Sequence, residues 1–97
     1  MSLSRGQIKY LKGICHHLKP VVMIGNKGLT ETVMAEIEGA LDQHELIKLK
    51  LRGSREQRAQ WIAGITTESK AELLLKIGQV ACFFRRNKDD PKLELPG

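Results

Sequence analysis

The chain has 97 residues, 41% of them apolar, and a formal net charge of +5, which suits one domain with a modest core. It has no run of roughly 20 apolar residues, and Met1–Ser4 is too short and polar for a secretory signal, which argues against a membrane-spanning or secreted protein. We expect a single domain over 1–97 in the cytoplasm, with a core at about 3–86 and a tail at 87–97. Cys15 and Cys82 are expected to be reduced thiols, and no metal or other cofactor is predicted.

The charges are unevenly distributed along the chain. Residues 1–30 contain five basic residues and no acid, whereas residues 31–45 contain five acids and no lysine or arginine. Basic residues again outnumber acids beyond residue 46. A positive field concentrated in this way is typical of a surface that meets a polyanion such as nucleic acid.

The first helix is predicted to begin after Ser4, which with Gln7 forms a capping box, and to end at Pro20. One apolar stripe of this helix is predicted to face the core: Ile8, Leu11, Ile14, Cys15 and Leu18. A second stripe is basic and, at a hundred degrees per residue, lies within about eighty degrees of arc: Arg5, Lys9, Lys12, His16 and Lys19. No carboxylate interrupts the basic stripe, so it is either a solvated face or a face that binds a ligand.

A short apolar strand at 21–24 is predicted to lead into the loop Gly25-Asn26-Lys27-Gly28, and a helix is predicted to follow from Thr30. Glycines let another backbone come close, and the free amides of a helix N-terminus attract anions. Lys27 adds a positive charge. The loop is therefore either a phosphate-binding loop or a tight turn whose glycines only satisfy the backbone. It lacks the Gly-Lys-Ser/Thr of a Walker loop and the third glycine of a dinucleotide fingerprint.

The helix after Thr30 is predicted to pack through an apolar stripe: Val33, Met34, Ile37, Ala40 and Leu41. Its acids are predicted to form an outer face: Glu31, Glu38, Asp42 and Glu45. Such a face repels phosphate and should point away from any nucleic acid. It is expected to be solvated, and the alternative is a contact surface for a basic protein partner.

The strand predicted at 46–52 alternates cleanly between apolar and basic residues. This pattern favours a sheet that is covered by helices on one face and exposed on the other. Ser54 and Gln57 then form a second capping box that opens a third helix. Trp61 on this helix is interpreted as packed against its own domain, with base stacking as the alternative.

The last segment is predicted to be a hairpin with strands at 71–77 and 80–86 around Gly78-Gln79. Phe83 and Phe84 point to opposite faces, which leaves one of them free to lie on the exposed face. Arg85 follows at the end of the strand. In the tail, a short edge segment is considered at 93–95.

The predicted order is therefore αβαβαββ, an α/β domain. Strands joined through helices should be parallel with right-handed crossovers, and the hairpin makes the four-stranded sheet mixed. No internal repeat is present.

With these residues in view, the chain resembles the stand-alone bacterial CRM domain proteins of the YhbY type. The resemblance runs from Leu3 to about Arg86. It rests on a series of ordered matches: Leu11-Lys12, 18–22, 25–30, Glu36-Ile37, Ala40-Leu41, 44–48, Ile77-Gly78 and Phe84-Arg85. Phe84 departs from the tyrosine expected there, so a hydroxyl contact at this position is not expected.

The resemblance implies an RNA-binding protein that acts in ribosome biogenesis on precursors of the large ribosomal subunit. It also implies a fold similar to the C-terminal domain of the third translation initiation factor. The Gly-x-x-Gly loop, here Gly25 to Gly28, is the RNA contact that it implies, and KH domains grip nucleotide backbones with a similar loop.

The sequence hypothesis is thus a non-catalytic, monomeric RNA-binding protein. Lys9, Lys12 and Lys19 would extend the RNA track if the first helix lies beside the loop, and Arg85 is a further candidate. A small enzyme that uses Cys15 beside His16 is a remote alternative, because adjacent helical residues point in different directions and Cys15 falls on the core stripe.

Overall fold

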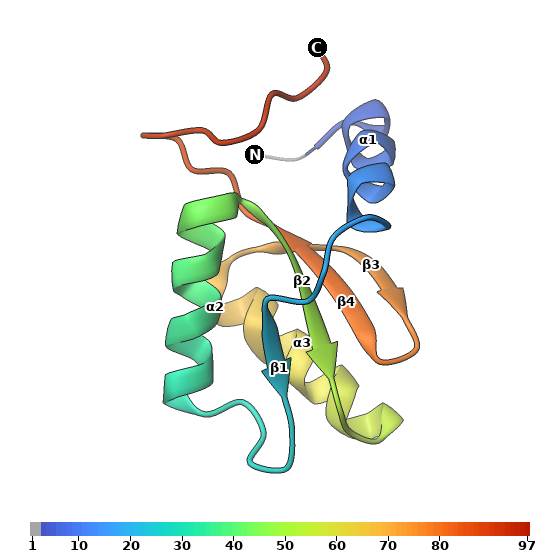
Figure 1. The fold of residues 1–97 in the computed structure, drawn as a ribbon, viewed down its shortest axis with the longest axis vertical. Helices are drawn as coiled ribbons and strands as arrows, with labels where there is room; N and C mark the ends of the chain where they lie inside the picture. The colour runs from blue at the N-terminus through green and yellow to red at the C-terminus, as the bar shows by residue number, and fades with distance from the viewer. Residues whose placement is uncertain (1–2) are drawn as a thin grey trace.

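The computed structural model describes residues 3–97 and confirms the predicted element order (Figure 1). The elements are α1 (Arg5–Cys15), β1 (Val22–Ile24), α2 (Glu31–His44), β2 (Leu46–Leu51), α3 (Arg55–Ser69), β3 (Glu72–Ile77) and β4 (Val80–Phe84). The strands lie in the order β1-β2-β4-β3, with β1 parallel to β2 and with β4 antiparallel to both β2 and β3. The mixed four-stranded sheet is confirmed, and each strand is one or two residues shorter than predicted.

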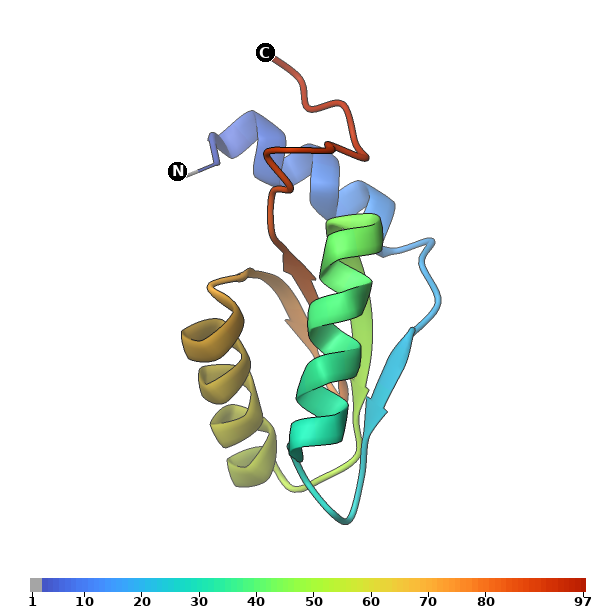
Figure 2. The same cartoon turned by 90° about the vertical axis from the view of Figure 1, so that its left-hand side faces the viewer.

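Helices α2 and α3 lie side by side on one face of the sheet (Figure 2). Ile47, Leu49 and Leu51 of β2 face these helices and are almost fully buried, as their alternation predicts. Trp61 is 9% exposed within this core, which agrees with its interpretation as a packed residue.

The opposite face of the sheet is not open along its whole length, and this corrects the sequence expectation. Helix α1 covers one end of it through Leu11 and Cys15, which pack with Leu46, Cys82 and Phe84. Phe83 is buried in the core on the other face, so neither phenylalanine is exposed. The alternation in β2 could not reveal α1, because Lys48 and Lys50 occupy the part of this face that α1 leaves half-open.

Helix α1 ends at Cys15, earlier than predicted. The amides of His17 and Leu18 donate to the carbonyls of Ile14 and Cys15, at 3.0 and 3.1 Å, and close the helix with tighter turns. Lys19 therefore lies in the linker and not on the basic stripe of the helix. Pro20 in addition disfavours helical backbone at Lys19 itself.

Glu45 is fully buried, although its spacing placed it on the acidic outer face of α2. It is the C-cap of α2 with φ of 62°, so the helical spacing no longer applies to it. Its carboxylate accepts hydrogen bonds from the amides of Asn87, Lys92 and Leu93 at 2.6 to 2.9 Å, and from Arg86 at 3.3 Å.

These bonds fold the C-terminal tail back over the end of the domain. Leu93 and Leu95 pack against the cluster beneath α1, and the Gln7 side chain donates to the Pro96 carbonyl at 3.0 Å. The segment 93–95 is not a strand of the sheet, which corrects the edge segment considered above.

Candidate nucleic-acid interface

The loop between β1 and α2 is a hydrogen-bonded turn. The Gly28 amide donates to the Gly25 carbonyl at 2.9 Å, which leaves Asn26 and Lys27 exposed at the centre of the turn. Thr30 caps α2 and accepts from the Val33 amide at 3.1 Å. The turn therefore brings a lysine and exposed main chain next to the positive end of a helix, which is a geometry suited to phosphate.

The two glycines of this turn have different structural requirements. Gly28 has φ of +74°, and a Cβ at this residue would lie 3.4 Å from Nε1 of Trp61. Gly25 has no positive φ, and a Cβ there would meet nothing within 4 Å. The fold thus favours glycine at position 28 but not at position 25, where the small residue leaves the main chain uncovered.

Helix α3 packs against the β1–α2 loop through Trp61. A Cβ on Gly53, in the linker between β2 and α3, would lie 2.5 Å from Cη2 of Trp61, so the indole ring packs directly on this glycine. Arg58 donates to the Gly53 carbonyl at 2.6 Å. The indole thus underlies both the β1–α2 loop and the β2–α3 linker.

We expect Gly53→Ala to destabilise the fold by about 1–3 kcal/mol, because the added methyl overlaps the Trp61 ring. Urea unfolding measures this change. Gly39→Ala on α2 is the matched control, since a Cβ there meets open space and the same substitution in a helix interior should be neutral or stabilising. Equal stability of the two variants would contradict the prediction, because it would show that the Trp61 ring can move aside for the added methyl group.

Sequence reasoning missed two arginines at the loop end of the molecule, Arg55 and Arg58, and treated Arg52 only as a weaker candidate on the basic face of its strand. Because β1 and β2 are parallel, the segments that follow them leave the sheet at the same end (Figure 1). The β2–α3 linker and the first turns of α3 therefore place Arg52, Arg55 and Arg58 at the end that carries Lys27. A hollow of about 350 Å³ there is lined by Arg55, Arg58, Lys76 and Gly78. The parallel crossover was the available signal, since it predicts which loops meet.

The lysines of α1 do not lie beside the loop. Lys9 and Lys12 are exposed, but α1 and the loop lie at opposite ends of the longest axis, along which the molecule extends 40 Å (Figures 1 and 2). The sequence hypothesis made Lys9 and Lys12 part of one RNA track only if α1 lay beside the loop, and α1 does not lie there. Lys19 lies between the two ends, and it shares a shallow groove of about 530 Å³ with Lys50 and Arg52.

Arg85 is also remote from the loop, at the end of β4 beside the last turns of α2. It pairs with Glu38 at 2.7 Å and Asp42 at 2.9 Å, and it donates to the Ser69 carbonyl at 2.9 Å. The structure therefore brings together Gly25, Asn26, Lys27 and Gly28 but separates Lys9, Lys12 and Arg85 from them. The ion pairs of Arg85 with Glu38 and Asp42 also neutralise part of the charge on the acidic face of α2.

The two cysteines are free and fully buried under α1. A hydrogen bond to the Cys82 thiol, together with burial, raises the pKa of the Cys15 thiol. A buried thiol with a raised pKa is poorly suited to act as a nucleophile.

In residues 3–97, no group of three or more His, Cys, Asp or Glu residues is placed to hold a metal ion. Over the same residues, none of the helices has the length and apolar character needed to cross a bilayer.

Similar proteins are named as RNA-binding proteins. A Haemophilus influenzae protein named "RNA-binding protein" is 47% identical over 98% of this chain and 96% of its own length. A Pseudomonas aeruginosa protein named "Probable RNA-binding protein" is 43% identical over 90% of this chain and 85% of its own.

A solved structure is also similar. It is the solution structure of a hypothetical Staphylococcus aureus protein described as a candidate RNA-binding protein. It superposes with a TM-score of 0.80 at 26% identity, covering 98% of this chain and 100% of that one. The family model for the CRS1/YhbY (CRM) domain matches residues 3–85. The chain therefore belongs to the CRS1/YhbY (CRM) domain family.

Proposed function

We propose that this protein binds RNA without catalysing a reaction, and that the turn Gly25 to Gly28 grips the RNA backbone. The observation that carries this proposal is the glycine at position 25. It is not needed for the backbone conformation or for packing, yet it keeps the main chain uncovered beside Lys27 and the α2 N-terminus. The names of the relatives support RNA as the polyanion.

In this mechanism the loop amides and Lys27 hold phosphates, and Gly25 lets the ribose-phosphate chain come close. The RNA continues either over Arg52 and Arg55 at the same end or along the groove that contains Lys50 and Lys19. Lys9 and Lys12 form a separate basic patch, which the RNA reaches only if it follows that groove along the molecule. Contacts of this kind position the RNA without reading its sequence.

The RNA that we propose is ribosomal, in precursors of the large subunit, bound by a monomer in the cytoplasm. This target rests on the likeness to YhbY-type proteins. Crosslinking in cells followed by sequencing of the attached RNA tests it. Recovery of large-subunit precursor RNA supports the target, and recovery of scattered messenger RNA contradicts it.

A pair of glycine variants tests the loop itself. Gly25→Val should leave stability within about 0.5 kcal/mol of the wild type, because its Cβ meets open space, but should weaken RNA binding about tenfold by blocking close approach. Gly28→Ala should destabilise the fold by about 1 kcal/mol through its positive φ. Filter binding to a ribosomal RNA fragment and urea unfolding measure the two effects. A folded Gly25→Val variant with wild-type RNA affinity would refute the grip.

The alternative of a protein partner on the acidic face of α2 gains no support from the geometry. Glu38 and Asp42 are paired with Arg85, and Glu45 is buried. The face therefore offers a basic partner less free charge than the sequence suggests.

A further inference from the structure

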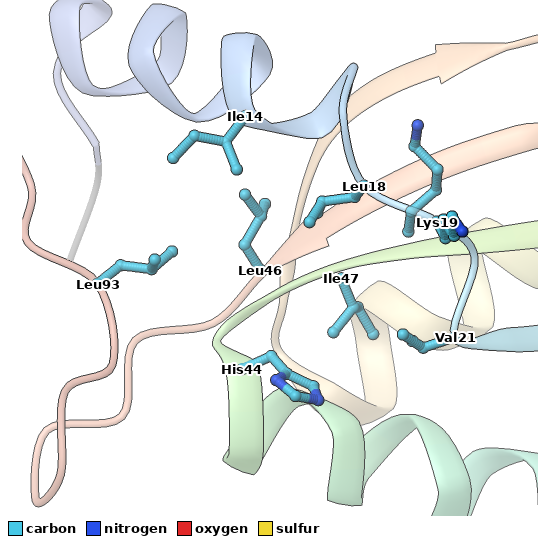
Figure 3. Close-up of a pocket in the computed structure, with 9 residues that line it drawn as sticks. Ile14, Leu18, Lys19, Val21, His44, Leu46, Ile47 and Leu93 are labelled. Atoms are coloured by element: carbon cyan, nitrogen blue, oxygen red, sulfur yellow. The ribbon is translucent and has the colours of Figure 1, made fainter.

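An apolar pocket lies where α1, the start of β2 and the C-terminal tail meet, away from the proposed RNA loop (Figure 3). It encloses about 390 Å³. Ile14, Leu18, Ile47 and Leu93 supply apolar walls, and Lys19, Lys48 and His44 also line it. Figure 3 shows these side chains coming from α1, the linker, β2, the end of α2 and the tail around one opening.

The pocket lies against a free edge of the sheet. Strand β1 pairs only with Leu49–Leu51, so the residues Leu46–Lys48 have β4 on one side and no strand on the other. Across this edge in residues 3–97, the last backbone bond runs from the Val21 amide to the Lys48 carbonyl, at 2.9 Å.

The direction of the free peptide groups follows from the pairing with β4. The Arg85 amide donates to the Glu45 carbonyl and the Leu51 amide donates to the Gln79 carbonyl, so odd-numbered residues of β2 bond to β4. Because alternate residues of a strand point their amides to opposite sides, the Leu46 and Lys48 amides point toward the pocket.

We propose that this pocket binds an extended segment of an acidic protein, which places one apolar side chain between Leu18 and Ile47 and carboxylates on Lys19 and Lys48. The free edge of β2 presents backbone groups that have no bonding partner. An extended peptide offers alternating amide donors and carbonyl acceptors that can pair with them, whereas an RNA backbone has no such alternation. The walls are almost entirely apolar, which suits an aliphatic side chain better than the polar edge of a base. The basic residues around the opening favour acidic flanks.

The tail supplies a preformed wall of this pocket. Leu93 forms one wall, and its amide is held by the buried Glu45 carboxylate at 2.9 Å. A preformed wall lowers the entropy cost of binding, so a short segment can dock without first ordering the tail.

The probe is a six-residue peptide with an apolar centre and acidic flanks, acetyl-DDLVDD-amide, followed by NMR of the full chain. We expect chemical shift changes around the pocket and slower hydrogen exchange at the Leu46 and Lys48 amides. Val21→Asn should weaken binding about fivefold, since this half-exposed side chain lines the pocket. Ile77→Asn is the matched control, because Ile77 is exposed to a similar degree but lies at the far end of β3.

Binding that is weakened about fivefold in Val21→Asn and unchanged in Ile77→Asn supports the proposal. No binding at millimolar peptide, equal binding by the two variants, or equal binding of a peptide with lysine flanks would overturn it. Equal protection of the Leu46 and Lys48 amides by a short single-stranded RNA would also overturn it, because the pocket would then belong to the RNA surface.

Discussion

Lys27→Glu is expected to weaken RNA binding about tenfold or more while leaving the fold intact. Lys27 is exposed at the centre of the turn and makes no ion pair within residues 3–97, so its replacement removes no packing. The change both deletes a phosphate contact and places a negative charge where the backbone of the RNA should lie. Titrations against a ribosomal RNA fragment at fixed salt measure the loss.

Salt dependence gives this prediction a second readout. If the interface engages about four phosphates, the logarithm of affinity should fall with the logarithm of salt concentration at a slope of about −3, taking the single-strand coefficient. Loss of the Lys27 contact should bring the slope to about −2. A variant that binds more weakly but keeps the original slope would place the loss in folding and not in phosphate contact.

The matched control for Lys27→Glu is Lys9→Glu. Both lysines are exposed and both variants change the net charge equally, but Lys9 lies on α1 at the other end of the molecule. A specific loop contact predicts a much smaller loss for Lys9→Glu. Equal losses would mean that net charge governs binding and that the loop has no special role.

The loop and the order of elements could be predicted because their signals are local. Ser4 with Gln7 and Ser54 with Gln57 are capping boxes that act over three residues, and both form as expected. The glycines at 25 and 28 likewise mark a turn that is closed by a bond between those same two residues. Local patterns of this kind can be recognised without knowing which elements pack against them.

The placement of α1 could not be read from the sequence, because its apolar stripe only shows that the helix packs against something. The stripe fits either face and either end of the sheet, and Leu11 and Cys15 happen to meet Cys82 and Phe84 at the end away from the loop. The position of Arg55 was missed for the same reason. Its place at the loop end, which also carries Lys27, depends on the parallel pairing of β1 with β2 and not on any nearby residue.

Glu45 was misplaced for a different physical reason. Helical spacing predicts the direction of a side chain only while the backbone stays helical, and this residue is the C-cap with φ of 62°. Its partners Asn87 and Leu93 lie more than 40 residues away, in a tail that carries no strong pattern of its own. A buried carboxylate held by distant amides leaves no periodic trace in a sequence.

That arrangement leads to the largest expected effect on stability. Glu45→Gln should lower the free energy of unfolding by about 2–4 kcal/mol, because an amide group cannot accept all the bonds that the buried carboxylate receives from three amides and Arg86. Urea unfolding gives the magnitude. Hydrogen exchange should show lost protection at the amides of Asn87, Lys92 and Leu93. Glu36→Gln is the matched control, since Glu36 is exposed on the same helix and should change stability little.

The pH dependence of stability tests whether the negative charge of the Glu45 carboxylate, and not only packing of the tail, stabilises the fold. Burial by itself would raise the pKa of the Glu45 carboxyl, but the amides of Asn87, Leu93 and Lys92 and the charge of Arg86 outweigh it and hold the pKa below its ordinary value. A carboxyl whose pKa is lower in the folded state contributes stability that is present above its unfolded pKa of about 4.3 and is lost as the pH falls through the folded value. The wild type should therefore lose more stability than Glu45→Gln as the pH is lowered from about 5. Parallel losses in the two proteins would mean that the tail is held by packing of Leu93 and Leu95 and not by the carboxylate.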